Sequence, residues 1–101
     1  MKTFMNKLNF HDCKDAAEVV ETVMSKLSGG GLEVAKTEDD ARAIIAGWGF
    51  PADDIHEGET YSRRAEIDDD VPVRISVTEF YGGDSGSVDY VYVVKCVELW
   101  P

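Results

Sequence analysis

The sequence predicts an α+β fold: two helices packed on one face of a three- to five-stranded, mainly antiparallel sheet. Three observations lead to this prediction. Apolar residues recur at helical spacing twice in the first half of the chain, they alternate with polar residues from residue 59 onward, and the last strand-like run is apolar on both faces. The chain has 101 residues, close to the commonest domain size, so we expect a single α+β domain over residues 1–101.

The first helix is predicted from about Asp12 to Ser28. Its apolar residues form one stripe at the spacing of an amphipathic helix: Ala16, Val19, Val20, Val23, Met24 and Leu27. Asp12 is suited to capping the first turn, and Asp15 adds a negative charge near the positive end of the helix dipole. The helix is expected to end at the three glycines 29–31, because glycine readily adopts the backbone conformation that stops a helix.

A short strand and a second helix are predicted next. Residues 32–36 fit a strand, and Thr37 is suited to capping the helix that follows. The apolar stripe of this helix is Ala41, Ile44, Ile45 and Trp48. Gly47 ends the helix and Pro51 prevents its continuation, while Pro51 also suits the start of a short turn through residues 53–55.

The second half of the chain reads as strands. Residues 59–67 and 73–81 alternate between apolar and polar side chains, and an acidic loop, 68–72, separates them. Gly, Asp and Ser at 82–87 indicate a hairpin turn, and the following run, 88–99, is apolar on both faces, as expected of an interior strand. Residues 1–10 favour an edge strand.

The charge of the chain narrows the classes of molecule that it is expected to bind. Twenty acids against ten bases give a formal net charge of −10, and residues 33–70 alone, with twelve acids and four bases, carry −8. Nucleic acids and anionic membranes attract cationic proteins, so direct binding to either is not expected. No apolar run approaches the roughly 20 residues that span a bilayer, and we expect a cytoplasmic protein.

The sequence favours no catalytic or metal-binding site, and we expect a protein that is not an enzyme and takes no cofactor. Cys13 with His11 or His56 offers the residue types of a thiol nucleophile and its base, so a small hydrolase or transferase stays open as a minor alternative. We expect Cys13 and Cys96 to be free thiols, with a disulfide between them as the second possibility.

Two surface features point instead to a protein partner. The first is the density of carboxylates, whose spacing on helices and strands is comparable with that of phosphates along a nucleic acid. The second is the aromatic face of the last strand, since Tyr and Trp are favoured in interfaces. The expected partner-binding residues are Glu38, Asp39, Asp40, Asp53, Asp54, Glu57, Glu59, Asp68, Asp69, Asp70, Tyr90, Tyr92 and Trp100. For the acids, the alternatives are a solvated acidic face or adaptation to high salt. For the aromatic residues, they are a second packing layer or a homodimer contact.

The acidic clusters at 38–40, 53–59 and 68–70 give the chain a resemblance to small phage-encoded anti-defence proteins of the anti-CRISPR and antirestriction types. The resemblance implies a stoichiometric inhibitor in the cytoplasm of a bacterial host. Such a protein would bind a basic protein or nucleoprotein complex, such as a nuclease or a CRISPR effector, by mimicking nucleic acid. This expectation requires the carboxylates of residues 33–70 to form one continuous patch.

Two other functions fit the same composition. An immunity protein against a basic nuclease toxin would be equally acidic, because it too covers a cationic surface. A homo-oligomeric accessory domain would use the aromatic strand face, which makes a homodimer a further expectation to test.

Overall fold

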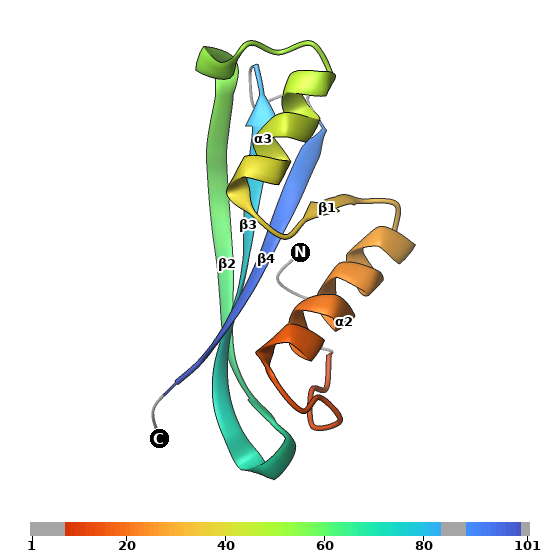
Figure 1. Ribbon diagram of the computed structural model, residues 1–101, viewed down its shortest axis with the longest axis vertical. Coiled ribbons are helices and arrows are strands. Elements are labelled where there is room, and N and C mark those ends of the chain that lie inside the picture. Colours follow the sequence, from red (N-terminus) through yellow and green to blue (C-terminus); the bar gives the residue numbers. More distant parts are fainter. Residues whose placement is uncertain (1–7, 84–88, 100–101) are drawn as a thin grey trace.

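The computed structural model describes residues 8–83 and 89–99, and its elements form one twisted sheet with two helices (Figure 1). The elements are α2 (Ala16–Gly29), β1 (Glu33–Ala35), α3 (Glu38–Gly47), the 3-10 turn η1 (Ala52–Asp54), β2 (Ile55–Ile67), the 3-10 turn η2 (Asp68–Asp70), β3 (Val71–Gly82) and β4 (Tyr90–Glu98). The strand order is β1-β4-β3-β2, with β1 parallel to β4 and the other neighbours antiparallel. The α+β class, the two helices on a mainly antiparallel sheet and the interior position of the last strand are therefore confirmed.

The two helices cover opposite faces of the sheet, which corrects the prediction that both pack on one face. On β4, Val91 and Val93 point to the side where Ala41 and Ile45 of α3 are buried. Tyr92 and Val94 point to the other side and pack with the buried residues of α2, Val19, Val23 and Leu27. The reason lies in β4 itself: both of its faces are apolar, so each face is stabilised by a helix that removes it from water. We call these the α3 face and the α2 face.

The helices also cover different parts of the sheet. In Figure 1, α3 crosses its upper half and α2 lies beside its lower half. Each face of the long sheet is therefore covered over part of its length only, and the molecule is elongated, with extents of 45 × 24 × 18 Å. Among the described residues, no helix is long and apolar enough to cross a membrane.

The N-terminus of α2 differs from the prediction. Asp15, not Asp12, caps the helix: its side chain accepts a hydrogen bond of 2.9 Å from the backbone N–H of Glu18. The Glu18 carboxylate in turn accepts one of 2.6 Å from the N–H of Lys14, so the two acids satisfy the first turn reciprocally. Before the cap, Cys13 is already buried in the core, which fixes the chain in an extended approach. The predicted Thr37 cap of α3 is confirmed: the Thr37 hydroxyl oxygen accepts a hydrogen bond of 3.1 Å from the backbone N–H of Asp40.

Strand β2 is longer than predicted, because it begins at Ile55 rather than at residue 59. Its first residues lack apolar alternation but pair with the end of β3, and the register shifts between Glu57 and Thr60. The acidic loop is confirmed as the turn between β2 and β3, where Asp69 and Asp70 adopt positive φ angles of 60° and 58° that Asp tolerates well. Of the predicted N-terminal strand, Leu8–Phe10 are not in a strand and residues 1–7 lie outside the described residues, as does the turn at 84–88.

Candidate protein-binding site

A row of aromatic rings crosses the α2 face, and its last member, Tyr92, packs against the core that α2 covers. Tyr81 on β3 and Tyr90 on β4 are cross-strand partners, and their rings meet edge to face with centroids 5.8 Å apart. The ring centroid of His56 on β2 lies 5.5 Å from that of Tyr81, and the ring centroid of Tyr92 lies 6.1 Å from that of Tyr90. The row therefore runs across three strands. Its register is set by backbone pairing, so the rings are held on a rigid platform.

Two carboxylates meet beside this row. The hydroxyl of Tyr61 donates to Glu59 Oε2 at 2.8 Å and also lies 3.2 Å from Glu79 Oε1. The hydrogen bond to Glu59, followed by partial burial and the charge of Glu79, raises the pKa of Tyr61 well above its usual range, so the hydroxyl keeps its proton. Neither glutamate forms an ion pair with any described residue. The carboxylates of Glu59 and Glu79 thus share one hydroxyl, and a nearby cation would stabilise both negative charges.

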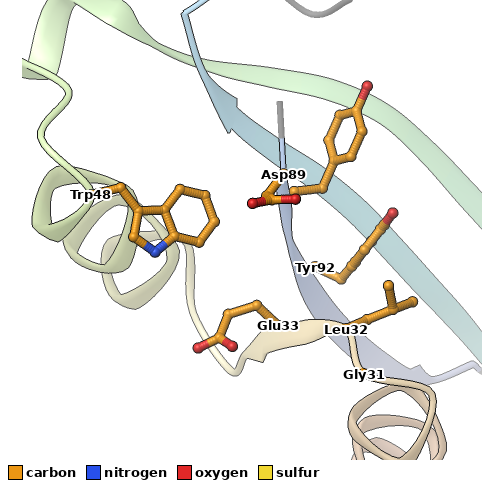
Figure 2. Close-up of a pocket in the computed structure, with 7 residues that line it drawn as sticks. Gly31, Leu32, Glu33, Trp48, Asp89 and Tyr92 are labelled. Atoms are coloured by element: carbon orange, nitrogen blue, oxygen red, sulfur yellow. The ribbon is translucent and has the colours of Figure 1, made fainter. Parts of the chain in front are cut away.

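Two shallow depressions lie at this end of the sheet and have one lining residue in common. The first, of about 460 Å³, is lined by Gly58, Glu59, Tyr61, Glu79, Tyr81 and Tyr90. The second, of about 310 Å³, is lined by Gly31, Leu32, Glu33, Trp48, Asp89, Tyr90 and Tyr92 (Figure 2). They share Tyr90, and no lining residue of either is a lysine or an arginine. We call the union of these residues the tyrosine–carboxylate surface.

Trp48 is the residue of this surface that the sequence pattern misplaced. Its helical spacing from Ala41 predicted a core position, yet its side chain is 42% exposed. The helix ends at Gly47, as predicted, so Trp48 is its C-cap residue and lies beyond the last buried turn, which the stripe Ala41, Ile44, Ile45 and Trp48 did not take into account. Glu33, Glu79 and Asp89 were not predicted either, because single acids in or beside strands carry no distinctive pattern.

The predicted acidic residues do not form one continuous patch. Asp53 and Asp54 lie in η1 at one end of β2, followed on the strand by Glu57 and Glu59, whereas Asp68–Asp70 lie at its other end. Twelve residue steps of a strand separate these ends by about 40 Å. The third cluster, Glu38–Asp40, is in the first turn of α3, where Glu38 lies 3.7 Å from Arg42. The long, nearly straight β2 therefore divides the acids into separate groups.

Of the predicted aromatic residues, two belong to the site. Tyr90 joins the two depressions, and Tyr92 lines the second one although only 8% of it is exposed. Burial, with smaller effects of Glu79 and Tyr90, raises the pKa of Tyr92, so its hydroxyl keeps its proton at neutral pH. Trp100 lies outside the described residues.

Three of the bases that form no ion pair with a described acid lie together elsewhere on the sheet. Arg64 and Arg74 are direct cross-strand partners on the lower, uncovered half of the α3 face, with Lys95 on the same face of β4. All three side chains are exposed and form no ion pair with a described residue.

Both thiols lie in or against the larger core. Cys13, considered above as a nucleophile, is 6% exposed, and its sulfur lies 3.7 Å from the Thr22 hydroxyl. Both cysteines are free. Within residues 8–83 and 89–99, no three His, Cys, Asp or Glu side chains are grouped so that they could hold a metal ion.

Cys96 is expected to be a slow nucleophile. Burial, with smaller effects of Glu98 and Cys13, raises the pKa of its thiol to about 11 from an ordinary value of 9.0. At pH 8 its thiolate fraction is then about a hundredfold lower, offset in part by the greater nucleophilicity of a more basic thiolate. Alkylation by iodoacetamide, followed by peptide mass spectrometry, should be ~10-fold or more slower than in the denatured chain and should accelerate as the pH rises toward 10. Equal rates would contradict the assignment.

Compared with known proteins, the chain matches no family model, no curated sequence and no solved structure. The functional interpretation therefore depends on the geometry and charge of the tyrosine–carboxylate surface itself.

Proposed function

We propose that the protein is a non-catalytic inhibitor that binds a cationic surface of a nucleic-acid-binding protein through its tyrosine–carboxylate surface. The proposed partner is a bacterial nuclease or a CRISPR-type complex, whose basic groove the protein would occupy in place of nucleic acid. This proposal moves the contact from one continuous acidic patch to one end of the sheet. The partner would be met in the bacterial cytoplasm.

The observation that carries the proposal is the pair of glutamates at the Tyr61 hydroxyl. Glu59 and Glu79 lie within 3.2 Å of the same oxygen and form no ion pair with a described residue. Two like charges this close repel each other in the free protein, and an arginine or lysine from a partner would relieve that repulsion. Such a gain appears only on binding, which is what a binding site requires.

The aromatic row gives this site the other property of a protein interface. Tyr81 and Tyr90 are partly exposed, rigidly placed and flanked by carboxylates. Tyr side chains supply apolar area at low entropic cost and attract cations over their faces. A basic groove that normally holds phosphates and stacked bases presents the complementary groups, namely cations and flat apolar surfaces.

The acids outside the site support binding at longer range. With a net charge of −10, the whole protein is attracted to a basic partner before contact, which accelerates association at low salt. Asp68–Asp70, about 30 Å from Glu59 along β2, would act in this way and not by touching the partner. This difference separates contact residues from steering residues experimentally.

Affinity capture from a bacterial lysate, at low and high salt and with nuclease treatment, tests the proposal with three versions of the protein. They are the natural sequence, E59Q/E79Q, and the control D68N/D69N/D70N, which removes three charges at the far end and keeps side chains that tolerate positive φ. We expect the natural sequence to capture a specific nucleic-acid-binding protein, and E59Q/E79Q to bind that protein with about a hundredfold lower affinity. The control should retain it with only a slower association.

The purified partner should also lose its binding to nucleic acid when the protein is added in equal amount. Retention of the partner by E59Q/E79Q together with its loss from D68N/D69N/D70N would contradict the proposed site. A dimer by light scattering that survives high salt and protects the tyrosines from solvent would instead favour the accessory-domain function.

A further inference from the structure

We infer that the second depression of the tyrosine–carboxylate surface is a pocket for an arginine side chain. Its polar and aromatic groups are Trp48, Glu33 and Asp89. That the arginine belongs to a protein partner rests on the proposed function. The chemistry of the pocket does not, and it can be tested on the free protein.

The three groups reach the pocket from three different elements. Figure 2 shows the Trp48 ring projecting from the end of α3 toward β4, where the Asp89 carboxylate lies, while the Glu33 side chain extends from β1 beneath it. Pairing fixes part of this arrangement: Glu33 is opposite Val91, and Asp89 directly precedes β4, two residues before Val91. The indole and both carboxylates therefore lie on the α3 face, around one space.

The edge of the sheet keeps this space open. Strand β1 has only three residues and begins at Glu33. The residue before it, Leu32, lies beside Tyr90 but is not paired with β4. Leu32 is 40% exposed and Trp48 42% exposed, and these are two of the three large apolar side chains exposed in the described part of the chain. Two of the three thus line one depression, which indicates an unfilled site more than chance exposure.

Guanidinium fits this combination better than other ligands. It is planar, so it can stack on an indole, and it can donate to two carboxylates at once. Glu33 and Asp89 form no ion pair with a described residue, so an anion would be repelled. A lysine ammonium is strongly hydrated and cannot stack as a plane. Two carboxylates without a third ligand make a poor metal site.

The size of the pocket agrees with a single side chain. Its volume of about 310 Å³ is at the lower end of the range for small-ligand pockets, and Tyr90 and Tyr92 form its boundary on the side of the aromatic row. Tyr90 lines both depressions, although the glutamate pair at Tyr61 lies on the α2 face and the carboxylates of this pocket lie on the α3 face. A partner that fills both depressions would therefore reach around the β1 edge of the sheet with at least two cations.

The test is a peptide titration of the free protein in a W100F background, where Trp48 is the only tryptophan. The probes are acetyl-Gly-Arg-Gly-amide and its lysine and citrulline analogues. The arginine peptide should change Trp48 fluorescence, and in NMR spectra it should shift the Trp48 indole N–H and the amides of residues 31–33 and 89–92, with millimolar affinity. The citrulline peptide, which keeps the shape and loses the charge, should cause neither change.

The matched variants are E33Q/D89N in the pocket and E66Q/D68N at the other end of the sheet, which remove the same number of charges. E33Q/D89N should weaken binding of the arginine peptide about tenfold, and E66Q/D68N should leave it nearly unchanged. Equal binding of citrulline or lysine, or equal weakening by both variants, would overturn the inference. Because the titration contains no partner, it can succeed even if lysate capture with E59Q/E79Q disproves the proposed function.

Discussion

Replacing Phe80 by alanine is expected to lower the free energy of unfolding by about 3–5 kcal/mol. Phe80 is 2% exposed on the α3 face, where it packs with Ala41, Ile45 and Ile55 in the smaller core. The Arg42 guanidinium lies 5.6 Å from the centre of its ring and would lose that contact as well. The loss is a large share of the roughly 5–15 kcal/mol that stabilises a typical domain.

Urea denaturation in the W100F background, followed by circular dichroism and by Trp48 fluorescence, measures this effect. The control is Val97→Ala on the same face, where the side chain is 55% exposed and its truncation should cost less than about 0.5 kcal/mol. Phe80 anchors α3. If the core under α3 unfolds independently of the core under α2, the fluorescence transition should occur at a lower urea concentration than the circular dichroism transition. A cost for Phe80→Ala no larger than that for Val97→Ala would contradict the described packing.

Replacing Gly82 by alanine is expected to cost about 2–3 kcal/mol, with the opposite cause: too little room instead of too much. An added Cβ would lie 2.5 Å from Cγ and Cδ2 of the Phe50 ring and 2.9 Å from Cγ2 of Ile45. Because Cγ is close to the Phe50 backbone, the ring cannot simply rotate away. The end of β3 therefore requires glycine so that α3 and its C-terminal loop can pack closely on the strand.

A double-mutant cycle identifies that cause. Phe50→Ala removes the obstructing ring, so G82A/F50A should be less destabilised than the sum of the two single variants. The control Gly47→Ala places a Cβ where nothing lies within 4 Å, at the last residue of α3, and should stabilise the protein by up to about 1 kcal/mol. Strict additivity in the cycle would show that Phe50 is not the obstacle.

Much of the fold could be predicted because it depends on local chemistry. The Thr37 cap and the spacing of Ala41 and Ile45 determine α3, and the run of apolar residues on both faces of β4 determines its interior position. The start of β2 could not be predicted, since residues 55–58 gain their strand conformation from pairing with β3 and not from their own pattern. The placement of Trp48 was missed because helical spacing was extended one residue beyond the end of α3.

By itself, the sequence determined which segments are helices and strands, the excess of acids and the aromatic character of the last strand, because these follow from side chains and their near neighbours. Only the tertiary structure decided which of those residues meet. It separated Asp53 from Asp68 by the length of β2, placed the two helices on opposite faces, and brought Glu59 and Glu79, twenty positions apart, to one hydroxyl. The physical reason is that strand register acts between distant segments, and no local pattern records it.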